Sequence, residues 1–218
     1  QIGSWYVANG NAINDTIYTT ESTKFLAMLP YAVDLNDALT GSLRTDFYAF
    51  NALSGTADYT NAAWRQALMD QIGSWYVANG NAINDTIYTT ESTKFLAMLP
   101  YAIDLDVALT GTVRADFATF YGVSGATALS NANWRKALMD QIGSWYVANG
   151  NAINDTIYNT ESTKFLAMLP YAVDLNDALT GSLRTDFYAF NALSGTADDT
   201  NPPWRQALMD QIGSWYVA

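Results

Sequence analysis

The sequence predicts an all-α fold of tandem repeats, each about 70 residues long, folded into about four short helices and stacked end to end. Three observations support this prediction. The decamer QIGSWYVANG begins at Gln1, Gln71 and Gln141, and QIGSWYVA recurs from Gln211. Such identity at a fixed period is the signature of a repeat architecture. Apolar residues recur at helical spacing in each period, and a hydrophobic share of 50% excludes a disordered chain.

The copies follow one another without a gap, and the first and third are nearly identical. The predicted helices place the repeats at residues 1–60, 61–130 and 131–200, with 201–218 as the first helix of a further repeat. Residues 1–8 then correspond to the second half of such a helix. We therefore expect either a window on a longer array or a first repeat that the last helix of a neighbouring molecule completes.

The first helix of a repeat is predicted from its cap, its apolar stripe and its stop. Asn61 is a suitable N-cap. Trp64, Leu68 and Ile72 follow at the spacing of one helical face, which Trp75 and Tyr76 extend. Asn79-Gly80 then ends the helix, because glycine readily adopts the left-handed conformation there. A β-hairpin that turns at Asn79-Gly80, with arms at 75–77 and 86–89, is not excluded. The helix is favoured because the apolar periodicity from Trp64 to Tyr76 is longer than a hairpin arm needs.

Three shorter helices are expected in the rest of the repeat. Residues 83–99 place apolar side chains on one helical face, although their Thr-rich middle leaves open an extended lead-in before a short helix from Ser92. Pro100 suits the first turn of the next helix, which runs to Leu109. Thr112 is the expected cap of the last one, and the variable residues 122–131 form a loop.

The composition excludes several classes of chemistry. The chain has no His and no Cys, which excludes Ser-His-Asp and Cys-His catalysis, metal sites built on those ligands, and disulfides. Carboxylate pairs for glycoside cleavage could be chosen from 21 acidic residues, so their presence indicates little. We expect no enzyme and no cofactor. A net charge of −11 argues against nucleic acid as a partner, and no apolar run predicts a transmembrane segment.

The segment Asp34-Leu35-Asn36-Asp37 has the composition of a calcium loop but not its spacing or its terminal Glu. The second copy has Asp104-Leu105-Asp106-Val107 instead and loses one carboxylate. We expect a solvated helix start whose acidic residues lie near the positive end of the helix dipole. Adventitious calcium binding stays open as an alternative in so acidic a chain.

Each copy holds one Asn-x-Thr sequon on a turn after the first helix, at Asn14, Asn84 and Asn154. These residues are candidate N-glycan acceptors if the chain is secreted. Only 14% of the residues are charged, and the expected surface is rich in Thr, Asn and Ser. Cytosolic surfaces carry more mixed charge, so we expect an extracellular or cell-surface location.

We predict a structural protein of an extracellular filament, stalk or surface layer, whose identical units pack head to tail. The alternative is a multivalent carbohydrate- or protein-binding adhesin, with aromatic residues as a sugar platform. The loops 51–63, 121–133 and 191–203 vary most, which disfavours a repeated binding site. The residues predicted to join successive units are Trp64, Leu68, Ile72, Trp75, Tyr76, Trp134, Leu138, Ile142, Trp145, Tyr146, Trp204, Leu208, Ile212, Trp215 and Tyr216.

Overall fold

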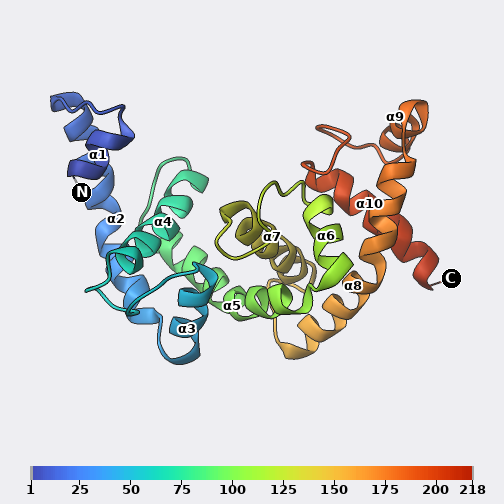
Figure 1. Ribbon diagram of the computed structural model, residues 1–218, viewed down its shortest axis with the longest axis horizontal. Coiled ribbons are helices and arrows are strands. Elements are labelled where there is room, and N and C mark those ends of the chain that lie inside the picture. Colours follow the sequence, from blue (N-terminus) through green and yellow to red (C-terminus); the bar gives the residue numbers. More distant parts are fainter. Residues whose placement is uncertain (1, 218) are drawn as a thin grey trace. The chain divides into compact units, whose positions relative to one another are not determined.

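The computed structural model describes residues 2–217, and within that range it consists of helices and loops with no strand (Figure 1). The all-α prediction is therefore confirmed. The β-hairpin alternative is wrong, because both of its arms lie in helices. The helices are α1 Ile2–Ala8, α2 Asp15–Ala38, α3 Gly41–Phe50, α4 Ala62–Ala78, α5 Asp85–Ala108, α6 Gly111–Phe120, α7 Ala132–Ala148, α8 Asp155–Ala178, α9 Gly181–Phe190 and α10 Pro202–Val217.

The helix predicted from Asn61 is α4, and its two ends are formed as expected. The Asn61 side chain accepts a hydrogen bond from the Ala63 backbone N–H at 2.9 Å. At the other end the helix stops at Ala78, and Gly80 has a φ of 70°, in the left-handed region that glycine tolerates best. The last short helix, α6, begins at Gly111 after Thr110, slightly earlier than the predicted cap at Thr112.

The second and third expected helices are one continuous 24-residue helix, α5, with Pro100 in its interior. An internal proline removes one backbone hydrogen bond and costs about 3 kcal/mol, so the sequence predicts that the helix ends before it. Leu99 and Ala102, on either side of Pro100, are both completely buried. Burial of the flanking residues offsets the cost of the proline, and neither a break nor an extended lead-in occurs.

The chain divides into two compact units, one up to Ala97 and one from Met98 onward. In the first unit α4 packs along α2. In the second, α6 and α10 both pack on α8. The long helices α2 and α8 thus carry the core of their units.

One buried polar motif ties three helices of the first unit together. The Trp64 indole N–H on α4 donates to the Asn36 side-chain oxygen on α2 at 3.0 Å, and Phe47 on α3 packs edge-on against the same indole. The Arg44 guanidinium lies over the Trp64 ring and donates to the backbone carbonyls of Asn36 and Leu39. Asn36 is buried in the last turns of α2, so the expectation of a solvated helix start at 34–37 is wrong.

The second unit contains this motif twice. Trp204 donates to Asn176 at 2.9 Å, with Arg184 over its ring. Trp134 donates to Asp106 at 2.7 Å, and Arg114 forms an ion pair with the same carboxylate at 2.7 Å. Among the described residues, no buried side-chain nitrogen or oxygen lacks a hydrogen-bond partner. Each tryptophan therefore locks the long helix to the two shorter helices that follow it.

Candidate assembly interface

In the first unit, the beginning of α5 rests on a surface formed by α2 and α4. Tyr31 of α2 stacks on Tyr88 of α5, with ring centroids 5.3 Å apart, and its hydroxyl donates to Asp85 at 2.9 Å. Trp75 of α4 packs edge-on against Tyr88 and Phe95, at 6.1 and 5.8 Å. We call this arrangement the tyrosine seam: a tyrosine and a tryptophan that receive the first turns of the next long helix.

The second unit contains the same seam, 70 residues further along the sequence. Tyr101 stacks on Tyr158 of α8 at 5.3 Å and donates to Asp155 at 2.9 Å. Trp145 of α7 packs against Tyr158 and Phe165 at 6.1 and 5.7 Å. The distances agree within 0.1 Å in the two units.

The seam keeps its phenols protonated far above neutral pH. Burial and the hydrogen bond to the Asp155 carboxylate raise the pKa of Tyr101 to about 12, and burial raises the pKa of Tyr158 to about 12. In the first unit the hydrogen bond to Asp85 is the main cause of the raised pKa of Tyr31. The hydroxyl that donates to the aspartate is therefore intact under physiological conditions.

The sequon asparagines cap the long helices, and Asn84 and Asn154 directly precede the aspartates of the seam. The side-chain oxygens of Asn14, Asn84 and Asn154 each accept a hydrogen bond from the backbone N–H three residues later, at 2.9–3.0 Å. All three residues are exposed. This cap sets the start of each long helix, and the aspartate that follows the cap in α5 and α8 is the one that accepts the tyrosine's hydrogen bond.

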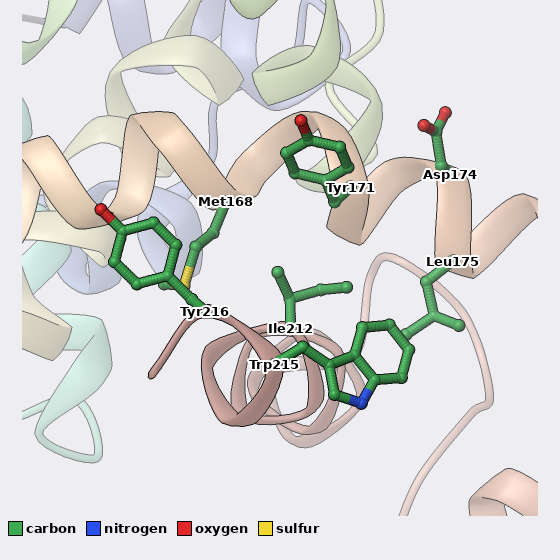
Figure 2. Close-up of a pocket in the computed structure, with 7 residues that line it drawn as sticks. All are labelled: Met168, Tyr171, Asp174, Leu175, Ile212, Trp215 and Tyr216. Atoms are coloured by element: carbon green, nitrogen blue, oxygen red, sulfur yellow. The ribbon is translucent and has the colours of Figure 1, made fainter. Parts of the chain in front are cut away.

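The same positions on α8 and α10 form an open groove instead of a filled seam. A pocket of about 450 Å³ lies between these helices. Figure 2 shows Met168 and Tyr171 on α8 and Ile212 and Trp215 on α10 around this space. The full lining is Met168, Tyr171, Asp174, Leu175, Ile212, Trp215 and Tyr216. Each lining residue lies 70 positions after its equivalent in α5 or α7. Tyr171 corresponds to Tyr101, and Trp215 corresponds to Trp145.

Burial shows how different the two situations are. Trp145 is 6% exposed, whereas Trp215, in the same sequence QIGSWYV, is 59% exposed. Phe190 at the end of α9 is 84% exposed, although Phe50 in the identical helix α3 is only 4% exposed. The sequences are the same, so the difference lies in what covers the side chains. In α6 the equivalent Phe120 packs against Phe165 of α8.

A complementary uncovered face lies on α2. Tyr18 is exposed, whereas its equivalent Tyr158 is buried, and Leu29 is 39% exposed, whereas Leu169 is completely buried. At its start α2 is covered by α1, where Trp5 packs edge-on against Tyr18 and against Phe25, both at 6.1 Å. No residue of α1 is buried. Helix α2 is therefore covered less well than α8.

The residues predicted to join successive units divide into three groups. The Trp, Leu and Ile positions of the stripe are buried, except the last tryptophan: Trp64, Leu68, Ile72, Trp75, Trp134, Leu138, Ile142, Trp145, Trp204, Leu208 and Ile212. Tyr76 and Tyr146 are half-buried. Trp215 and Tyr216 are exposed in the groove. That these residues hold one repeat to the next stays a prediction.

Sequence reasoning missed the tyrosine of the seam. Tyr31 lies directly after Pro30, and the local sequence favours the equivalent Pro100-Tyr101 as the first turn of a separate helix. Its partners Asp85 and Tyr88 lie more than 50 residues later. The signal that could have found this contact is the position of Tyr31 on the buried face of one long helix that runs through the proline.

Two properties of the described residues, 2–217, bear on the site. No group of three or more Asp and Glu side chains is placed to hold a metal ion in that part of the chain. None of its helices combines the length and hydropathy needed to cross a bilayer. The chain matches no protein-family model, no curated protein and no solved structure.

Proposed function

We propose that the chain is a non-catalytic structural protein that builds an extracellular filament, stalk or surface layer by head-to-tail packing of identical repeats. The observation that carries this proposal is the recurrence of the tyrosine seam. The same tyrosine stack, hydrogen bond and tryptophan contacts receive the start of a long helix in both units. A contact that works twice within one chain can extend an array without a new surface.

The tyrosine seam joins two different surfaces, which supports assembly into open chains rather than closed dimers. One side of the seam is a tyrosine and a tryptophan, and the other is the first turns of a long helix. A contact between two different surfaces is heterologous, and it produces rings or open filaments instead of symmetric pairs.

A binding function has one specific observation in its favour. The groove combines the exposed aromatic side chains of Tyr171, Trp215 and Tyr216 with the Asp174 carboxylate, a combination that suits sugar stacking. The equivalent position beside Tyr101 is filled by Tyr158. Without repeated sites there is no avidity to gain, so we place a carbohydrate- or protein-binding adhesin second.

The extracellular location and glycan attachment belong to the same proposal. The capping hydrogen bonds use the side-chain oxygens of Asn14, Asn84 and Asn154. N-glycosylation modifies the side-chain nitrogen. Capping and glycosylation are therefore compatible at one residue, and mass spectrometry of the chain from its native source would find the glycans.

Electron microscopy of the concentrated chain tests the proposed function. We expect filaments or sheets with an axial period of about 20–40 Å per repeat, judged from helices that rise 1.5 Å per residue. Monodisperse particles of 23.9 kDa at every concentration would contradict assembly. A glycan array with the same sample separates the two functions, because a sugar-binding adhesin gives specific signals and a purely structural protein gives none.

A further inference from the structure

We infer that Tyr121 and Arg205 form a latch between the second and third copies of the repeat, and that this latch fixes the order of the two copies. The second copy begins at Gln71 and the third at Gln141. Both latch residues lie in the second unit. The contact joins two copies of one chain, so the inference goes beyond the proposed assembly and does not rest on it.

Tyr121 follows the last residue of α6, and its neighbours fix the orientation of its ring. The rings of Phe117 and Phe120 pack against it, with centroids 4.6 and 5.5 Å away. Its hydroxyl donates to the side-chain oxygen of Gln141 on α7 at 2.8 Å, and Gln141 is buried. The ring is therefore held in place by α6 and α7 before any residue of the third copy reaches it.

Arg205, in the first turn of α10, supplies the other half of the latch. Its guanidinium carbon lies over the Tyr121 ring, 4.4 Å from the ring centroid. Arg205 also donates to the backbone carbonyl of Asp199, and it is only 8% exposed. A ring face attracts a guanidinium, and the attraction becomes stronger when water is removed from the cation. The contact therefore holds the start of α10 against the end of α6.

The latch depends on a residue that only the second copy has. The first and third copies have Asn51 and Asn191 in place of Tyr121. Each of these asparagines donates from its side chain to the backbone carbonyl four residues earlier in its own helix, at 2.9 Å. An asparagine has no ring for a guanidinium. The second copy is therefore the one that can hold the arginine of the copy that follows it.

The third copy differs from the first at the place where it meets the second. The two copies differ at four positions, and three of these, Asp199, Pro202 and Pro203, lie within six residues of Arg205. Helix α10 begins at Pro202. Proline suits the first turn of a helix, because its φ is fixed near the helical value and that turn needs no N–H donor. The prolines thus stiffen the turn that presents Arg205.

The backbone of the second copy passes close to the third copy beside the latch. A methyl group on Gly122 would lie 3.5 Å from the Thr200 methyl carbon and 3.9 Å from the Asp199 Cβ. The first copy has Tyr59 at the position of Asp199. A tyrosine at position 199 would need space for a ring between the two loops. The short aspartate therefore matches the second copy, and a third copy with the first copy's residue would not.

Hydrogen–deuterium exchange of the full chain at residues 199–208 tests the latch. Tyr121→Phe and Tyr121→Leu both lose the hydroxyl bond to Gln141, but only the phenylalanine keeps a ring for Arg205. We expect the opening equilibrium constant of these residues to be at least about tenfold higher in Tyr121→Leu than in Tyr121→Phe. When both are combined with Arg205→Met, the difference should fall below about twofold, because no cation is left to bind.

Two results would overturn the latch. One is an equal opening constant in Tyr121→Phe and Tyr121→Leu. The other is a tenfold difference that persists with Arg205→Met, because apolar packing alone would then explain it. The matched control is Arg65→Met. Arg65 is exposed and donates to the Tyr59 carbonyl, as Arg205 does to that of Asp199. We expect a smaller effect at residues 59–68 than Arg205→Met has at 199–208, and equal effects would assign Arg205 to its own loop.

The fixed order of the copies has its own pair of variants. Asp199→Tyr gives the third copy the residue of the first, and we expect it to raise the opening constant of residues 199–208 at least about threefold. Asp199→Asn keeps the size of the side chain and should change this constant less than about twofold. Exchange in Asp199→Tyr equal to that of the parent chain would overturn the fixed order. None of these residues belongs to the tyrosine seam, so such a failure leaves the proposed function in place.

Discussion

The Tyr101 hydroxyl donates to Asp155 while its ring stacks on Tyr158, three residues further along α8. The two contacts act on neighbouring turns of one helix face. A hydrogen bond to a carboxylate is directional and fixes the rotation of α8 about its axis, and the stacked ring fixes its position along that axis. One tyrosine therefore sets the register in which a long helix docks.

Alkaline pH should weaken this seam, and Tyr101→Phe should show it. The pKa of Tyr101 is raised to about 12 in the folded chain from 10.0. The folded state therefore holds its proton more tightly, so the stabilisation is complete below pH 10 and is lost as the pH rises towards 12. We expect the melting temperature to fall more steeply between pH 10 and 12 in the parent chain than in Tyr101→Phe. Equal slopes would contradict this assignment.

The arginine that lies over each core tryptophan ring should be important for stability. Arg114 bonds the Asp106 carboxylate and the backbone carbonyls of Asp106 and Leu109, and it lies over the Trp134 ring. We expect Arg114→Met to lower the free energy of unfolding by about 2 kcal/mol in urea titrations. The control is Lys136→Met, which breaks a solvent-exposed ion pair with Asp140 and should cost less than about 0.5 kcal/mol. Equal effects would show that the buried network contributes nothing special.

The acceptor of the indole N–H should tolerate a neutral amide but not an apolar side chain. Asn36 and Asn176 already accept this bond where the second copy has Asp106. Asp106→Asn should change the free energy of unfolding by less than about 1 kcal/mol. Asp106→Leu leaves the Trp134 indole N–H without its acceptor and should cost about 2–3 kcal/mol. A large loss in Asp106→Asn would mean that the ion pair with Arg114 carries the stability.

The internal prolines should be a cost that packing offsets. Pro30 lies inside α2 and its side chain is exposed, so replacing it removes no core contact. Pro30→Ala restores a backbone donor to the helix, and we expect the first unit to unfold at higher urea concentration, with a gain of about 1–3 kcal/mol. A loss of stability would indicate that the ring restricts the unfolded chain more than it strains the helix.

The sequence predicts most of the local structure but not the contacts between helices. The cap at Asn61, the apolar stripe and the stop at Gly80 are local signals, and the structure confirms them. The helix through Pro100 was missed because its continuation depends on the burial of Leu99 and Ala102, which local spacing does not reveal. The open groove was missed for another reason. Trp145 and Trp215 have the same sequence context, and only the structure distinguishes a covered copy from an uncovered one.

Association between molecules should become stronger with salt. Each molecule carries a net charge of −11, so two molecules repel each other as they approach. The seam contacts on which the proposed assembly depends are mostly aromatic, and salt weakens them little. Raising NaCl from about 0.02 M to about 0.5 M shortens the screening length from about 20 Å to about 4 Å. We therefore expect a lower dissociation constant at high salt in sedimentation equilibrium. Weaker association at high salt would mean that ion pairs, rather than the tyrosine and tryptophan contacts, hold the molecules together.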